Sequence, residues 1–108
     1  MSALFRSRAV IEPTDHIGVL YLRFFIPMAG SLKAKRSVIK SLKDRVRNRY
    51  NVSVSEIGDL DKWQSSVIGI CAISSDKIYL DQQFQDLITF VTGEGGGADL
   101  LEHQIQFS

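Results

Sequence analysis

Alternating and continuous apolar segments predict four β-strands in this chain. Residues 16–26 (HIGVLYLRFFI) are rich in β-branched and aromatic side chains and stop at Pro27, and residues 63–74 form a second, longer apolar run. Both have the composition of strands that are buried in the middle of a sheet. Residues 52–57 alternate between apolar and polar side chains, and so do residues 101–107, where Leu, His, Ile and Phe alternate with Glu and Gln. We expect these two segments to be outer strands, the last with one solvated face.

Two further segments have the apolar spacing of amphipathic helices. The first is predicted over residues 32–50, with Ser31 as its N-cap. Its apolar side follows steps of three, four and seven residues: Leu32, Ile39, Leu42, Val46 and Tyr50. The second is predicted over residues 76–92, with Ser75 as its N-cap and the glycine-rich residues 93–97 as its end. Its buried side is expected to carry Leu80, Phe84, Leu87, Ile88 and Val91.

The resulting order is βαββαβ, which is typical of the ferredoxin-like α+β fold. This fold has a four-stranded antiparallel sheet in the order 4-1-3-2, with two helices on one face. It places the two most apolar strands, 16–26 and 63–74, in the centre. We therefore expect one ferredoxin-like domain over residues 16–108, preceded by an N-terminal extension of uncertain order, residues 1–15.

The face of the sheet without helices is also expected to be apolar. If Leu20, Leu22 and Phe24 face the helices, alternation turns their neighbours to the other side. The side chains on that face are then Val19, Tyr21, Phe25, Val67, Cys71 and Ile73. Exposed apolar patches usually mark interfaces, so we expect a homodimer through the sheet. Two alternatives are cover by the extension, with Leu4, Phe5, Val10 and Ile11, or a small-ligand site.

Charge changes this picture of an ordinary folded domain. The chain has 108 residues, 44% of them hydrophobic and 23% charged, with a net charge of +1. Eight of its 13 Lys and Arg residues lie in residues 33–49 with one acid, Asp44, so this stretch carries +7 and the remainder −6. Such a local field attracts polyanions.

Five of the cations form a ribbon along one flank of the first predicted helix. At about 100° per residue they fall within an arc of about 80°. These residues are Lys33, Arg36, Lys40, Lys43 and Arg47. An ordinary solvated helix face mixes both signs, because like charges three or four residues apart repel. The near absence of acids favours an anionic partner, with RNA ahead of DNA or lipid, over a merely solvated face.

The sheet itself does not look like a reader of bases. The RNA recognition motif has the same βαββαβ order, but stacks bases on aromatic side chains of a characteristic third strand. The segment 62–73 does not match that pattern. Phosphate contacts from the helix, which are sensitive to salt and weakly specific for sequence, are the more plausible mode.

Other chemistry has weaker support in the sequence. Glu56, Asp59 and Asp61 surround a predicted turn and could hold a divalent ion, but acidic turns are common. His16 and His103 fall on neighbouring predicted strands without a third ligand. We therefore expect no metal site, no cofactor, no catalytic residues and no enzyme.

The one cysteine, Cys71, is expected to be a buried, inert thiol. We find no signal peptide or membrane-spanning segment in the sequence, so we expect the protein to be cytoplasmic.

One run of the chain closely resembles the YlxP-like family of small bacterial proteins. The resemblance is carried by residues 31–58 (SLKAKRSVIKSLKDRVRNRYNVSVSEIG) and continues through Asp61-Lys-Trp-Gln64 to Ser74-Ser-Asp76. It covers about residues 16–92 and fades towards the C-terminus, while residues 1–15 depart from the family pattern. It implies a ferredoxin-like fold. The function of the family is not known, but its genes often lie near those for translation initiation and ribosome maturation, which implies a ribosome-associated role.

These observations lead to two functional hypotheses. The first is a non-catalytic RNA- or ribosome-associated protein of small-subunit maturation or translation, which binds phosphates through the five-cation ribbon. The second is a dimeric, small-ligand-binding regulatory module that uses the apolar face of the sheet.

Overall fold

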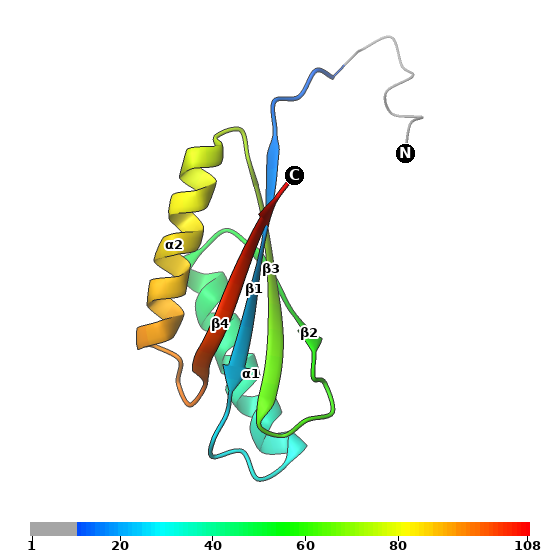
Figure 1. The fold of residues 1–108 in the computed structure, drawn as a ribbon, viewed down its shortest axis with the longest axis vertical. Helices are drawn as coiled ribbons and strands as arrows, with labels where there is room; N and C mark the ends of the chain where they lie inside the picture. Colours follow the sequence, from blue (N-terminus) through cyan, green and yellow to red (C-terminus); the bar gives the residue numbers. More distant parts are fainter. Residues whose placement is uncertain (1–10) are drawn as a thin grey trace.

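The computed structural model describes residues 11–108 and has six elements in the predicted order. They are β1 (His16–Phe25), α1 (Leu32–Arg49), β2 (Ser53–Gly58), β3 (Ser65–Ser74), α2 (Lys77–Gly93) and β4 (Asp99–Phe107). The strands form one antiparallel sheet in the order β2-β3-β1-β4, which confirms the ferredoxin-like α+β prediction. The two most apolar strands, β1 and β3, lie in the centre of the sheet (Figure 1).

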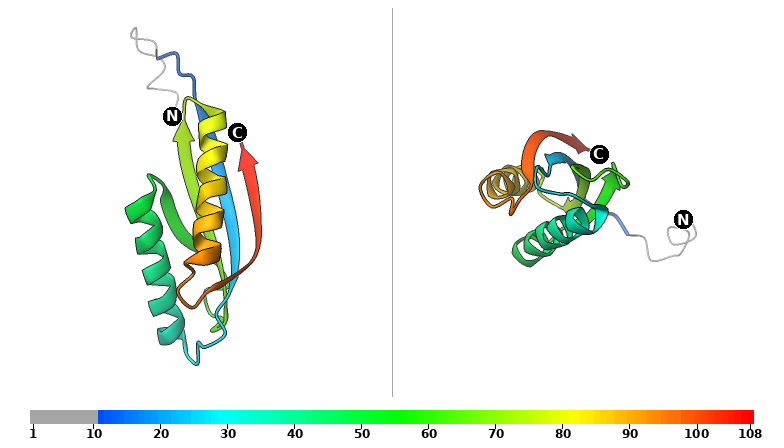
Figure 2. Two further views of the ribbon diagram at one scale, coloured as in Figure 1. Left: turned by 90° about the vertical axis from the view of Figure 1, so that its left-hand side faces the viewer. Right: turned by 90° about the horizontal axis from the view of Figure 1, so that it is seen from below.

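Both helices pack on the same face of the sheet, and the other face has no helix over it (Figure 2). The alternation of β1 directs Leu20, Leu22 and Phe24 into the core, as predicted. They are buried together with apolar residues of β3, α1 and α2, among them Ile68, Ile70, Ile39, Leu42, Val46, Leu80, Phe84 and Leu87. Burial of each such side chain contributes about 1.5–3 kcal/mol. This layer fixes α1 against the sheet and so decides which of its side chains face solvent.

The first helix starts where the sequence predicted and the second does not. The Ser31 Oγ accepts a hydrogen bond from the backbone N–H of Ala34 at 3.0 Å, which confirms this N-cap. The prediction of Ser75 as the second cap was wrong, because Asp76 occupies that position. Its carboxylate accepts from the backbone N–H groups of Ile78 and Tyr79. A carboxylate also interacts favourably with the positive end of the helix dipole.

A register shift in the last strand corrects the predicted alternation of residues 101–107. Arg23 pairs with Glu102, but the next residue, Phe24, pairs with Leu100. The bulge leaves Leu101 60% exposed, while Leu100 packs against the core. One extra residue in a strand moves the following side chains to the other face, so the predicted inward position of Leu101 was wrong.

Candidate nucleic-acid interface

Lys35, in the first turns of α1, is turned away from the ribbon and is a buried cation. Its side chain is 1% exposed, and its Nζ lies 2.7 Å from the Glu56 Oε2 in β2. The same ammonium donates to the backbone carbonyl of Asp59 at 2.5 Å, and the Ser66 hydroxyl donates to the same carboxylate oxygen at 2.7 Å. This cation therefore holds α1 to the β2–β3 hairpin.

Two more cations of α1 are also used inside the domain. The Arg45 guanidinium donates to the carbonyl oxygens of Glu94 and Gly95, which follow the end of α2. The Arg49 guanidinium lies 4.6 Å from the centre of the Phe90 ring and 5.8 Å from that of Tyr50. Cations at such distances are attracted by aromatic rings. Lys35, Arg45 and Arg49 therefore serve packing between elements.

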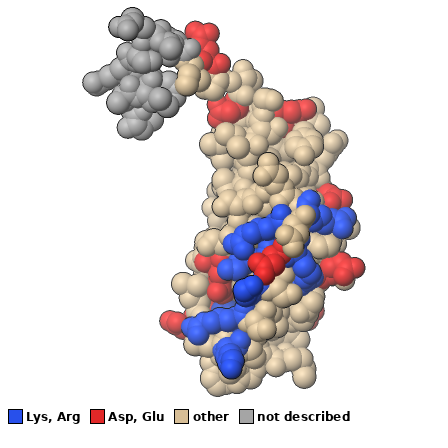
Figure 3. All heavy atoms as spheres, turned by 180° about the vertical axis from the view of Figure 1, so that it is seen from behind, with Lys and Arg blue, Asp and Glu red and all other residues tan. Residues whose placement is uncertain are grey.

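The five cations of the predicted ribbon lie on the outer side of the same helix. Lys33, Arg36, Lys40 and Arg47 are exposed and Lys43 is partly exposed. Figure 3 shows Lys and Arg side chains gathered over this side of the molecule, with an acidic side chain among them. The packing of α1 thus sorts its cations as the helical spacing predicted. Whether an anion binds to the ribbon stays a prediction.

Asp44 neutralises one part of the ribbon and leaves the other part without an acid. Its carboxylate lies 2.8 Å from the Nζ of Lys40 and 3.5 Å from the Nη1 of Arg47. The hydrogen bond from Lys40 lowers the pKa of this carboxyl below its ordinary value. Within residues 11–108, Lys33, Arg36 and Lys43 make no ion pair or side-chain hydrogen bond.

The acidic hairpin turn is occupied by the chain's own cations and hydroxyls. Asp59 accepts from the Ser65 hydroxyl at 2.5 Å and lies within 3.5 Å of the side chains of Arg23 and Lys62. These contacts, the Ser65 hydrogen bond above all, lower the pKa of Asp59. Glu56 is held by Lys35. In the part of the chain that the structure describes, no three potential ligand side chains are grouped around a possible metal position.

The two histidines lie on neighbouring strands but far apart. His103 pairs with Leu22 of β1, whereas His16 is six residues further back on that strand. At about 3.3 Å per residue this separates them by roughly 20 Å along the strand. They share no site.

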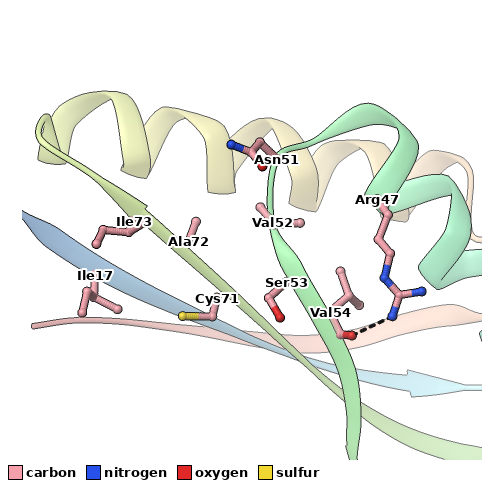
Figure 4. Close-up of a pocket in the computed structure, with 9 residues that line it drawn as sticks. All are labelled: Ile17, Arg47, Asn51, Val52, Ser53, Val54, Cys71, Ala72 and Ile73. Carbon is pink, nitrogen blue, oxygen red and sulfur yellow. Dashed lines mark hydrogen bonds between the residues drawn. The ribbon is translucent and has the colours of Figure 1, made fainter. Parts of the chain in front are cut away.

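The sequence did not predict a groove beside the start of β2 (Figure 4). It has a volume of about 730 Å³ and arises because β2 begins opposite Cys71, so that Ala72 and Ile73 of β3 extend past it. Apolar side chains of β1, β2 and β3 line it, together with Asn51 and Arg47. The Arg47 guanidinium donates to the carbonyl of Val54 at 2.9 Å. The groove therefore lies next to one end of the ribbon.

Cys71 is exposed on the helix-free face, so the prediction of a buried thiol was wrong. The apolar run around it suggested burial, but strand alternation places it opposite the core-facing Ile70 and Ala72. The same alternation leaves Ile17, Phe25 and Ile73 exposed, as expected for an uncovered face. Leu4, Phe5 and Val10, which could cover that face, lie outside the described residues, and Ile11 is exposed.

Solved structures with a similar backbone fold support the ferredoxin-like fold of this chain, and nothing beyond the fold. The de novo designed protein Foldit4 matches with a TM-score of 0.50 and 12% identity, over 87% of this chain and 96% of its own. SnoaB, a cofactor-independent oxygenase from Streptomyces nogalater, matches with a TM-score of 0.50 and 15% identity, over 85% of this chain and 91% of its own.

Within residues 11–108, no helix is both long enough and apolar enough to span a membrane.

Sequence relatives identify the family. The "Uncharacterized protein YlxP" of Bacillus subtilis (strain 168) is 43% identical over 75 residues, which are 69% of this chain and 82% of that protein. The family described as "Protein of unknown function (DUF503)" matches residues 17–105, which include all six elements except the ends of β1 and β4. This chain therefore belongs to the DUF503 family and is a YlxP-like protein.

Proposed function

We propose that this protein is a non-catalytic, RNA- or ribosome-associated protein, acting in small-subunit maturation or translation. Its ribbon of Lys33, Arg36, Lys40, Lys43 and Arg47 binds phosphates of structured RNA. The observation that carries the proposal is how α1 uses its cations. Lys35, Arg45 and Arg49 contact other elements of the domain, whereas the five ribbon cations lie on the outer side with only Asp44 between them, and of these five Arg47 alone also donates to a backbone carbonyl, that of Val54.

The internal contacts of the domain do not account for the ribbon. Lys33, Arg36 and Lys43 make no ion pair or side-chain hydrogen bond within residues 11–108, and neighbouring like charges on a helix repel. The acids that could relieve them are used elsewhere: Glu56 and Asp59 neutralise other cations. An arrangement that costs folding stability is favoured when a ligand supplies the missing negative charge.

The dimensions of the ribbon suit a nucleic acid better than a small anion. From Lys33 to Arg47 the helix rises by about 21 Å, at 1.5 Å per residue. That length corresponds to roughly six nucleotide steps at about 3.4 Å each. The cations lie on one convex helix flank, which gives phosphate contacts without access to base edges, so binding should depend on salt more than on sequence.

A double charge reversal with a matched control tests the proposal. Lys33→Glu/Lys43→Glu changes two exposed lysines of the ribbon that have no acidic partner in the described chain. Lys62→Glu/Lys77→Glu makes the same chemical change and the same change in net charge outside α1, at the hairpin turn and at the start of α2. Both doubles are compared with the unchanged protein for co-sedimentation with purified ribosomal subunits and for binding of structured RNA over a salt series.

The ribbon double should lose most binding at low salt, and its log–log salt slope should fall by roughly 0.7–0.9 for each phosphate that the protein no longer neutralises. The control double should keep most of its binding and its slope. Equal losses in the two doubles would indicate a response to net charge alone and would refute a specific ribbon. Binding of neither RNA nor subunits by the unchanged protein would refute the proposal as a whole.

The groove favours a second candidate, a small-ligand-binding regulatory module built on the apolar face of the sheet. A volume of about 730 Å³ is in the range of small-molecule sites, and its apolar walls carry a few polar groups, as such sites do. A thermal-shift screen of metabolites tests this candidate. A ligand that raises the melting temperature of the protein but not of an Ile73→Lys variant would support it. No response to any metabolite would count against it.

A further inference from the structure

The helix-free face of the sheet has an apolar centre and polar margins. The central strands contribute Ile17, Val19, Tyr21, Val67, Cys71 and Ile73 to it, all of them partly or fully exposed. The outer strands contribute mostly polar side chains: Ser53 and Ser55 from β2, Gln104 and Gln106 from β4, with the half-exposed Ile57 of β2 as an apolar exception. This distribution is the one found at protein–protein interfaces, where an apolar core is surrounded by a polar rim.

The centre of this face contains both a projection and a hollow. Ile73 is 68% exposed and projects from β3. Four residues earlier on the same strand and the same face, Gly69 forms the floor of a hollow of about 250 Å³. Tyr21 lines one side, and the Ile57 side chain leans over Gly69, with its Cδ1 2.8 Å from the position that a Cβ on Gly69 would take. The hollow exceeds several-fold the roughly 30 Å³ that one water occupies, so a branched aliphatic side chain fits into it.

The projection and the hollow are related by a simple symmetry. Consider two copies that pack with their helix-free faces against each other. The twofold axis lies in the plane between the two sheets, runs perpendicular to the strands and passes over Cys71 of β3. That axis reverses the direction of β3, so Ile73 of each copy lies over Gly69 of the other. On β1, the residue beside Cys71 is Val19, which then meets its own counterpart. One axis therefore places both central strands, β1 and β3, over their own counterparts in the other copy.

The same axis also pairs other side chains of the face. On β1 it brings Ile17 of one copy over Tyr21 of the other, and apolar–aromatic contacts of this kind are favourable. It also brings Arg23, which is already paired with Glu102 and Asp59 of its own chain, towards Asp15 of the second copy, because Arg23 and Asp15 lie four positions on either side of Val19. At the margins, Ser53 and Gln106 meet their own counterparts, so uncharged side chains are opposed at these points.

The available area is sufficient for a dimer. β1 and β3 have ten residues each, β4 has nine and β2 has six. At about 3.3 Å per residue and about 4.8 Å between strands, these give a face of roughly 550 Å². Two copies would bury roughly 1,100 Å², just above the roughly 1,000 Å² that a biological interface should exceed. The interface is thus small, and its affinity depends on how well its centre packs.

We propose that the open face of the sheet binds a second copy of this chain, about a twofold axis across β3 at Cys71, with Ile73 of each copy packed against Ile57 in the hollow at Gly69 of the other. This inference is independent of the RNA-binding proposal, because α1 lies on the opposite side of the sheet.

A lysine at the projection tests the interface. Ile73→Lys replaces a side chain that is largely exposed in the single chain, so folding should be unaffected. Two charges then enter the centre of each dimer, and the dissociation constant should rise by at least about 100-fold. Ile78→Lys is the matched control, since Ile78 is 72% exposed on α2, on the helical side. It should leave the dissociation constant unchanged.

Light scattering after size exclusion and sedimentation velocity measure the result over a concentration series. The unchanged protein and Ile78→Lys should have twice the 12.1 kDa mass of one chain, and Ile73→Lys the mass of one chain. A single-chain mass for the unchanged protein at every concentration would overturn the proposal. An Ile73→Lys variant that remains a dimer would also overturn it.

Cross-linking tests the position of the axis. Cys71 is the one cysteine of the chain, so a short bis-maleimide should join two copies through it. In a Cys71→Ser background, Ile73→Cys should cross-link less, because the two thiols then lie roughly 13 Å apart along the strands. If the Ile73→Cys variant cross-links as efficiently as the protein with Cys71, the axis runs along the strands instead, and the proposed arrangement is wrong.

Discussion

Removal of the Lys35 ammonium tests how α1 is held to the hairpin. Lys35→Met keeps the length of the side chain and deletes its charge. In the native protein this ammonium is 1% exposed and lies 2.7 Å from the Glu56 carboxylate and 2.5 Å from the carbonyl oxygen of Asp59. The variant leaves the carboxylate and the carbonyl without their donor, in a place where little water replaces it.

The contacts of Glu56 set the size of the effect. Removal of one partner from a fully buried ion pair costs about 3–5 kcal/mol. The Glu56 side chain is 14% exposed and keeps the hydrogen bond from the Ser66 hydroxyl, so part of this penalty is relieved. We therefore expect a loss of about 2–3 kcal/mol in the free energy of unfolding. With an unfolding slope of about 1–3 kcal/mol/M, the urea midpoint should fall by roughly 1–3 M.

Urea unfolding followed by circular dichroism measures this loss, and the helix itself provides the control. Lys33→Met makes the same change two residues earlier, at an exposed position, and should cost less than about 0.5 kcal/mol. The double variant Lys35→Met/Glu56→Met removes both charges and should be more stable than Lys35→Met, because no carboxylate is left unpaired. Equal losses for Lys33→Met and Lys35→Met, or strictly additive losses in the double variant, would refute the role assigned to the pair.

Three further changes test other parts of the fold. Because the pKa of Asp59 lies below its ordinary value of 3.8, the ionised carboxylate stabilises the fold above that pH, and this contribution is lost as the pH falls through the lowered pKa. In acid titrations, the free energy of unfolding should therefore fall less below about pH 4 in Asp59→Asn than in the native protein. Gly18→Ala places a Cβ 2.5 Å from the ring of Phe84 and should cost about 1–3 kcal/mol in urea unfolding, whereas an unchanged midpoint would mean that the ring moves freely. Asp76→Ala should cost about 1 kcal/mol because it removes the cap of α2, and Ser75→Ala next to it much less; the reverse order would restore Ser75 as the cap.

The sequence was sufficient for the fold because its local patterns agree with one another. The alternation of β1 determined which side chains are buried, and the 3.6-residue spacing of α1 separated its apolar side from the ribbon. The inward direction of Lys35 was predictable in the same way. Its partner was not, because Glu56 is brought to it by a contact between α1 and β2, 21 residues apart.

The errors arose where the structure depends on a single residue or on distant contacts. Leu101 was misplaced because a bulge against β1 shifts the register, and nothing in the alternation of residues 101–107 indicates one. Cys71 was expected to be buried because its neighbours are apolar, although strand alternation already placed it on the open face. The groove depends on how far β3 extends past β2, which is a property of strand pairing and not of either segment alone.

The two proposed surfaces lie on opposite sides of the sheet, and this makes them separable. Because α1 lies on the helix-covered face of the sheet (Figure 2), the two copies of α1 in the proposed dimer face outwards, away from each other. One short RNA then contacts one ribbon, so Ile73→Lys should leave its affinity unchanged. A large particle with two accessible phosphate surfaces can engage both ribbons, and the dimer should bind it more tightly than the Ile73→Lys variant. Lys33→Glu/Lys43→Glu should in turn leave the dimer intact. An Ile73→Lys variant that loses short-RNA binding would contradict this separation, and would indicate that RNA reaches the open face of the sheet.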